Sequence, residues 1–398
     1  MLRRSGSILT VLGLLLLLAA AAVRFLLPGL AIRYPGGPLD TTMHSSGELT
    51  RYPDPTIVPP RAGAQVLPLS VSRRLRLVDA AGERATVRED EQETVGDLPA
   101  QSFAQQYVLD RRTLRGVADP RAFSYSVGNQ VDRLGTFTVG LPFEAGAGPY
   151  PVWQNEVGRA YDVRRTGSSW VSGVRLSRYE GSLAGAAVQP AYVDALAAQA
   201  IAARLTPTQA AARFTAQGID IAALRRLVLP RLTPDDRASA VAVLAAGIPL
   251  RFTLDASAAY LVEPRTGAVV GLDRVDETLF AAPDLTGLSR LGALLSAPRH
   301  AKNGAVQRAA RAVRAVVARP PMARVQHVVY AQTRASIADL VAFWAARGDR
   351  IDLVRRTVPL TLLLSGLLLL GVGLVLVLVA GRRPPGRHAA PSGRPTGH

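Results

Sequence analysis

Two long uncharged apolar runs bracket the chain. The first extends from Ser5 to Val23 and the second from Thr357 to Gly381. A helix over the second run would extend roughly 37 Å, which is enough to cross the hydrocarbon core of a bilayer with some tilt. The pattern therefore predicts a C-terminal transmembrane helix. Its glycines Gly366, Gly371 and Gly373 are ordinary for a membrane span or, as the less favoured alternative, mark a close helix contact.

The first run is open to two interpretations. Arg3 and Arg4 precede it and alanines end it, which is typical of a signal peptide as well as of an uncleaved anchor. Apolar residues resume from Phe25 to Ile32, and Arg24 could extend its side chain to the membrane surface. We therefore favour an anchor, with a cleaved signal peptide as the alternative.

Arginines outside the two runs predict the orientation. They are Arg3, Arg4, Arg382, Arg383, Arg387 and Arg394. Cytoplasmic flanks of membrane spans are enriched in such residues. Both termini are therefore expected in the cytoplasm and the main domain outside the cell membrane.

Alternating apolar and polar residues predict strands after the first run. The segments are 74–78, 103–109, 134–141 and 171–179. We expect a meander of short, interrupted antiparallel strands.

Helical patterns follow, and then strands return. Thr206-Pro207 and Thr233-Pro234 each combine a helix cap with proline in the first turn. Residues 250–279 read as strands again, with Pro264 and Gly267 in a hairpin turn. Further along, we expect a helix over 302–318.

The last part before the second run predicts a strand at 325–330 and a helix that continues into the span. Thr333 or Ser336 can cap this helix, and no proline intervenes before Pro359.

These patterns give the fold class α+β: a β-rich extracytoplasmic domain with a helical insertion, flanked by N- and C-terminal transmembrane helices. The expected segments are the anchor or signal peptide (1–32), the β-rich part (33–189), the helical insertion (190–248), the β-return with a basic helical segment (249–335), the helical stalk and transmembrane helix (336–381), and a disordered basic cytoplasmic tail (382–398).

The charge balance is strongly basic, with a net charge of +17. Between Leu285 and Ala338 there is no acidic residue. A possible anionic-ligand surface, for lipid headgroups or acidic envelope polymers, consists of Arg299, Lys302, Arg308, Arg311 and Arg314. The favoured alternative is a solvated helix face, or one paired with the acidic segment 89–93. We expect no nucleic-acid partner.

Few residues in the sequence suggest catalytic or metal-binding chemistry. The chain has no cysteine, which excludes disulfides and thiolate catalysis, and its five histidines are far apart. We therefore expect no metal, no cofactor and no enzymatic activity. Asp273, Asp276 and Glu277 could face a cleft with Asp255, but a hairpin rim is the favoured interpretation. An exported hydrolase with an unrecognised site is a weaker alternative, which a buried carboxylate cluster would strengthen.

Four sequence motifs resemble a known family. They are Tyr150-Pro-Val-Trp153, Trp170-Val-Ser-Gly-Val174, the segment 260–267 and the entry to the second run at 353–359. The chain resembles the actinobacterial two-span proteins of unknown function called the porin PorA family. The resemblance covers most of the chain and supplies no catalytic residues, and its name implies a pore.

We therefore expect a membrane-anchored envelope protein that binds a lipid, lipoglycan or protein partner through its external domain. The alternative is a porin or channel-type transport protein. An apolar tunnel in the β domain would favour lipid binding, whereas a β-barrel pore requires an apolar outer face.

Overall fold

The computed structural model describes residues 2–26, 33–34, 38–52, 63–198, 201–215, 219–318 and 322–381. The predicted basic tail (382–398) and most of the apolar continuation after the first run (27–32) lie outside the described residues. Two compact units are present, one made of residues 1–36 and 346–398 and the other of residues 37–345.

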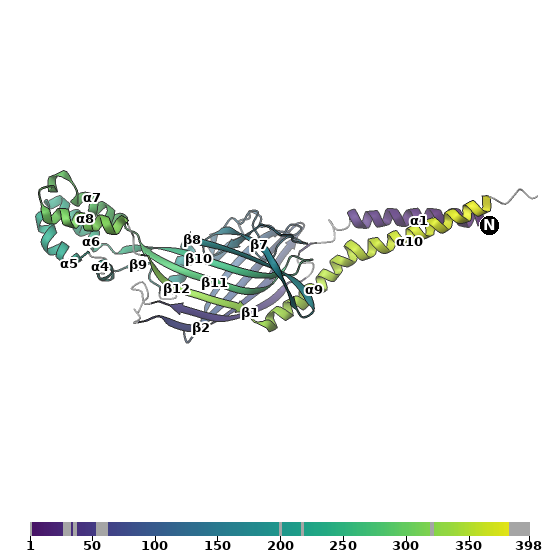
Figure 1. The fold of residues 1–398 in the computed structure, drawn as a ribbon, viewed down its shortest axis with the longest axis horizontal. Helices are drawn as coiled ribbons and strands as arrows, with labels where there is room; N and C mark the ends of the chain where they lie inside the picture. The colour runs from purple at the N-terminus through teal and green to yellow at the C-terminus, as the bar shows by residue number, and fades with distance from the viewer. Residues whose placement is uncertain are drawn as a thin grey trace, which may run out of the picture. The chain divides into compact units, whose positions relative to one another are not determined.

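The unit of residues 37–345 is built on one curled antiparallel sheet (Figure 1). Eleven strands follow one another in the order β5-β4-β3-β2-β1-β12-β11-β10-β8-β7-β6, and the short β9 pairs with β10. The strands are β1 (Asp40–Arg51), β2 (Gln65–Ala81), β3 (Arg84–Val95), β4 (Gln101–Asp110), β5 (Phe123–Gln130), β6 (Tyr150–Gln154), β7 (Arg159–Val171), β8 (Val174–Ala187), β9 (Arg204–Leu205), β10 (Ile248–Val262), β11 (Val269–Pro283) and β12 (Ala323–Gln332).

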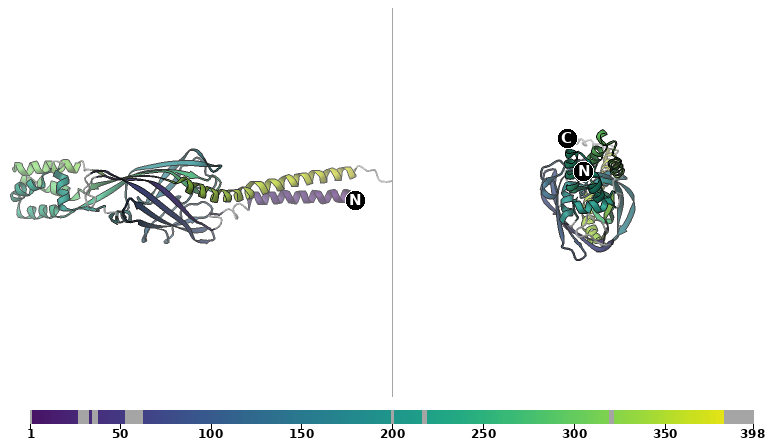
Figure 2. Two further views of the ribbon diagram at one scale, coloured as in Figure 1. Left: turned by 90° about the horizontal axis from the view of Figure 1, so that it is seen from below. Right: turned by 90° about the vertical axis from the view of Figure 1, so that its left-hand side faces the viewer.

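The two ends of the sheet are joined by isolated backbone bridges. Leu109 of β4 pairs with Gly116, and Arg115 pairs with Phe137. Phe137 in turn pairs with Val152 of β6. These bridges connect β4 to β6 across the gap, so the curled sheet encloses an interior (Figure 2).

One predicted strand is wrong, and another begins too early. Residues 134–141 form single bridges at Phe137 and Gly140, because this segment crosses between the sheet ends instead of pairing along a neighbour. Residues 174–179 lie in β8, as predicted, but 171–173 end the preceding strand and form the turn, since Val171 pairs with Val174 and both Ser172 and Gly173 have positive φ. Such a two-residue turn matches the twist of the flanking strands. The segments 74–78 and 103–109 lie within β2 and β4, as predicted.

The strands are also longer than predicted. Several contain 12 to 17 residues. The reason is that buried positions also carry charged residues, such as Glu89 and Glu91 of β3, which hides the alternation in the sequence.

Helices follow the β8 strand and then the β11 strand. They are α3 (Pro190–Ala198), α4 (Pro207–Thr215), α5 (Ile221–Ala223), η1 (Leu224–Val228), η2 (Leu229–Arg231), α6 (Pro234–Ala245), α7 (Thr286–Leu295), η3 (Pro298–His300), α8 (Gly304–Ala318) and α9 (Arg334–Asp352). Thr233 caps α6 by accepting a hydrogen bond from the Asp236 N–H, as predicted. The α8 helix and the β10–β11 hairpin are likewise confirmed. Thr333, the first of the two candidates, caps α9 by accepting from the Ser336 N–H at 3.3 Å.

One apolar core holds α3, α4, α6, α7 and α8 against one end of the sheet. Its buried residues include Phe214 of α4, Leu291 of α7 and Val313 of α8. They pack with Phe252 of β10 and Leu279 of β11. The helical part therefore shares its core with the sheet.

The outer face of the sheet carries exposed ion pairs. Arg74 contacts Asp40 at 2.6 Å, and Arg274 contacts Asp276 at 2.7 Å. A β-barrel that faces lipid requires an apolar outer band. This sheet therefore faces water on its outside.

The second unit is a pair of apolar helices, α1 (Leu2–Phe25) and α10 (Val358–Gly381), and the π-helical turn η4 (Leu353–Thr357) leads from α9 into α10. Both helices are long and apolar enough to cross a membrane. They lie antiparallel, with Gly6 beside Gly373 and Gly13 beside Gly366. A Cβ on Gly13 would lie 2.8 Å from the Gly366 carbonyl oxygen, so the backbones are in close contact. Gly366 and Gly373 therefore mark a close helix contact, which was the less favoured interpretation of the sequence. Gly371 instead faces open space.

Candidate functional site

Three glutamates on β3 point into the enclosed interior. Glu89, Glu91 and Glu93 alternate along the strand with residues of the outer face. Since successive strand side chains point to opposite faces, a spacing of two places all three on one face. The intervening Asp90 faces outward and contacts Arg76 at 2.6 Å.

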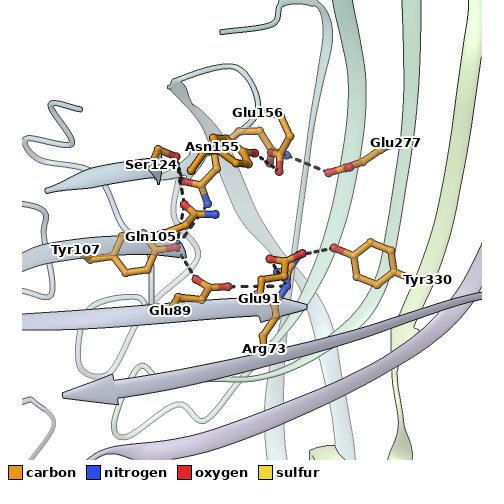
Figure 3. Close-up of polar contacts among 12 residues, drawn as sticks. Arg73, Glu89, Glu91, Gln105, Tyr107, Ser124, Asn155, Glu156, Glu277 and Tyr330 are labelled. Carbon is orange, nitrogen blue, oxygen red and sulfur yellow. Dashed lines mark hydrogen bonds and ion pairs between the residues drawn. The ribbon is translucent and has the colours of Figure 1, made fainter. Parts of the chain in front are cut away.

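Arg73 of β2 is the central cation of this interior (Figure 3). It pairs directly across the strands with Glu91, and its Nε lies 3.0 Å from the Glu91 carboxylate. The same guanidinium lies 3.8 Å from Glu89 and donates a hydrogen bond to the Tyr330 hydroxyl at 2.7 Å. One arginine thus offsets part of the charge of two carboxylates.

A second cluster of polar side chains surrounds Glu89 from the direction of β4. The Tyr107 hydroxyl donates to Glu89 at 2.5 Å. The buried Arg133 donates to the Asn155 side chain at 3.1 Å, and its guanidinium lies 4.6 Å from the centre of the Tyr107 ring. These contacts fix the position of Glu89 from the side opposite Arg73.

Two further glutamates come from distant parts of the chain. Glu277 of β11 accepts a hydrogen bond from the Gln154 amide at 3.0 Å. Glu156 accepts one from the Tyr125 hydroxyl at 3.0 Å and another from the Gln154 amide. Gln154, at the end of β6, therefore bridges the two carboxylates, and Figure 3 shows Glu156 and Glu277 on the same side of the interior.

These residues surround two cavities of about 120 and 30 Å³. Both are lined by Arg73, Glu91, Glu156, Glu277 and Tyr330.

The smaller cavity contains an unsatisfied acceptor. It is also lined by Glu93 and by Gln326 of β12, which is only 4% exposed. The Gln326 Oε1 has no hydrogen-bond partner in the described part of the chain. A buried acceptor without a partner is costly, so this oxygen is available to a donor that enters the cavity.

Burial changes the protonation of the carboxyls. It raises the pKa of Glu277 to about 8, with the nearby Glu156 charge adding to the effect. Burial also raises the pKa of Glu89 and, together with the neighbouring Glu91, that of Glu93. Glu277 therefore holds a proton at neutral pH, because the interior disfavours its charged form.

The sequence suggested that four acidic residues face one cleft, but they do not lie together in the structure. The four are Asp255, Asp273, Asp276 and Glu277. Only Glu277 faces the interior. Asp273 pairs with Arg178 at 2.9 Å, Asp276 lies on the outer face, and Asp255 accepts from the Gly185 N–H. The favoured hairpin-rim interpretation is wrong for Glu277, because the period of two sends it to the opposite face from Asp276.

The basic candidate surface lies on and before α8. Arg308, Arg311 and Arg314 are exposed on one face of the helix, and Lys302 is exposed before it. Arg299 is instead held by Asp236 at 2.5 Å. The suggested pairing of this surface with the acidic segment 89–93 is wrong, since Glu89 and Glu91 face Arg73 inside the sheet.

Within the described ranges, no group of three or more His, Cys, Asp or Glu side chains is arranged to hold a metal ion. The interior glutamates are held by arginine, tyrosine and glutamine instead. This arrangement suits a ligand that offers hydrogen-bond donors or positive charge.

The sequence model of the Porin PorA family matches residues 5–375. The chain belongs to the Porin PorA family. The match includes most of both apolar helices and all of the curled sheet with its interior glutamates. No curated protein matches the chain.

Proposed function

We propose that this Porin PorA family protein has a transport-type function at a membrane, in which the polar interior of the curled sheet takes up a small cationic solute. The observation that carries the proposal is the enclosed group of five glutamates with the unpartnered Gln326 Oε1. Carboxylates in excess over arginine favour positive charge, and a free acceptor favours an N–H donor.

The charged outer face of the sheet indicates which part of the protein can contact lipid. A sheet with exposed pairs such as Arg74–Asp40 is not suited to lipid contact, so the sheet forms a compartment in water. The elements suited to crossing the bilayer are α1 and α10. In the proposed function, the sheet holds the solute in water, and the two helices anchor the protein in the membrane.

The lipid-binding interpretation finds less support in the sheet. It required an apolar tunnel, whereas the larger cavity combines carboxylates, tyrosines and arginine with apolar residues such as Met43, Val139 and Leu272. The hydrolase alternative does gain the buried carboxylate cluster that it required. We nevertheless retain a binding function, because Arg73 and Tyr107 hold Glu91 and Glu89 in ion pairs and hydrogen bonds.

Binding of n-butylammonium to the full chain in nanodiscs, measured by equilibrium dialysis, tests the proposed solute compartment. Glu277→Gln should weaken binding at pH 9 more than at pH 6, because the carboxyl is charged only above its raised pKa of about 8. Glu48→Gln, on the exposed face of β1, is the matched control and should leave binding unchanged. No binding by the unmodified chain at any pH would contradict the uptake of a cationic solute.

We further propose that both termini are cytoplasmic and that the sheet lies outside the cell membrane. The antiparallel contact of α1 and α10 supports this, since it leaves both chain ends on one side. The chain has no cysteine, so single cysteines can be introduced and labelled cleanly. A membrane-impermeant maleimide should label Thr94→Cys in whole cells but not Ser392→Cys. The reverse pattern would contradict the topology.

A further inference from the structure

A larger cavity than those of the sheet interior lies in the helical part and differs from them in character. Its volume is about 360 Å³. The lining comes from α4, α5, α6, the start of β10 and the start of α7, and most of it is apolar, including Phe214, Ile221, Val243 and Leu288. Ligand pockets are typically concave, apolar and of at least this size, with a few charged groups at the edge.

Three charged residues line this cavity, and one of them is already satisfied. Asp284 accepts hydrogen bonds from Thr286 and pairs with Arg251 at 3.0 Å. The side chains of Arg204 in β9 and Arg290 in α7 are exposed, and neither guanidinium makes a hydrogen bond or ion pair within the described ranges. The cavity therefore combines an apolar wall with two unpaired guanidinium groups.

We propose that this cavity binds a single-chain amphiphile with an anionic head group, such as a fatty acid. The alkyl chain lies against Phe214, Val243 and Leu288, and the carboxylate is bound by Arg204 and Arg290. Apolar burial supplies affinity in proportion to chain length, and a guanidinium binds a carboxylate through two parallel hydrogen bonds. This site is separate from the carboxylate-lined interior and does not depend on the proposed transport function.

Photolabelling of the full chain in phosphatidylcholine nanodiscs tests the site. The probe is decanoate with a terminal diazirine, and its comparison is the corresponding alcohol. We expect the carboxylate probe to label peptides from α4, α6 and α7, and to do so about tenfold more strongly than the alcohol. Unlabelled octanoate, decanoate and dodecanoate should compete with increasing strength, by about three- to fourfold per methylene until the cavity is filled.

Two kinds of variant probe the two parts of the site. Arg204→Gln with Arg290→Gln should reduce labelling to the level of the alcohol, while Arg308→Gln on the exposed face of α8 is the matched control. Gly287→Leu should fill the cavity, because a Cβ at this position meets only Val243 Cγ1 at 3.5 Å. Gly304→Leu, at the start of α8, is its control.

Three results would overturn the proposal. They are labelling confined to α1 and α10, equal labelling by the alcohol and the carboxylate, and labelling that survives both the double arginine variant and Gly287→Leu. The arginine substitutions are at exposed positions and leave the apolar core intact, so a failure of Gly287→Leu to fold would not remove the test.

Discussion

Arg73 and Glu91 face each other across β2 and β3, with the guanidinium Nε 3.0 Å from the carboxylate inside the curled sheet. Glu89 and Tyr330 contact the same guanidinium. This side chain therefore holds together carboxylates that would otherwise repel one another.

Replacement of Arg73 by glutamine should destabilise the sheet strongly. The substitution leaves Glu89 and Glu91 enclosed without their cation, and loss of one partner of a buried ion pair costs about 3 kcal/mol or more. Urea unfolding followed by tryptophan fluorescence measures the effect. Arg74→Gln, which removes an exposed pair with Asp40 on the same strand, should cost about 1 kcal/mol or less. Equal losses in the two variants would contradict the central role of Arg73.

Glu277→Gln should change how stability depends on pH. The pKa of Glu277 is raised from 4.5 to about 8 in the folded protein, so between these values the folded state holds a proton that the unfolded state releases. Stability should therefore fall as the pH rises from about 4.5 to about 8, and level off above that for this group. The glutamine variant lacks this contribution. Its melting temperature should decline less between pH 5 and pH 8 than that of the unmodified chain, whereas parallel curves would show that Glu277 titrates normally.

Uptake of a cation by the interior should release protons. A bound cation favours the charged form of Glu277, which holds a proton at neutral pH because of burial. Calorimetric titration with n-butylammonium at pH 7, in buffers of different ionisation enthalpy, reports the number of protons released. We expect a positive number that decreases in Glu277→Gln and is unchanged in Glu48→Gln. Heat that does not depend on the buffer would count against this coupling.

The glycine contact between α1 and α10 should be sensitive to side-chain size. Gly13→Leu must separate the helices, because even a Cβ would lie 2.7 Å from the Leu370 backbone nitrogen. Spin labels on Leu18→Cys and Leu364→Cys, both at exposed positions, allow the separation to be measured in nanodiscs. The distance distribution should lengthen or broaden in Gly13→Leu. Gly371→Leu faces open space and should leave it unchanged.

Part of the interior site was readable in the sequence. Glu89, Glu91 and Glu93 recur every second residue, which places them on one face of a strand. That pattern does not say which face is enclosed, because both faces of the strand carry charged residues. Glu156 carried no signal, and Glu277 was only one of four acidic residues that could face a cleft, because both reach the interior only through the pairing of β6, β7, β8, β10 and β11.

The sequence by itself determined the two apolar helices, the capped helix at Thr233, the hairpin turn at Gly267 and the family. These features depend on composition and on contacts between near neighbours in the chain. Only the tertiary structure decided that the sheet curls and closes through Phe137, that glutamates gather inside it, and that α1 packs on α10 through glycine. The reason is that each of these depends on pairings between residues far apart in the sequence, whose partners no local pattern specifies.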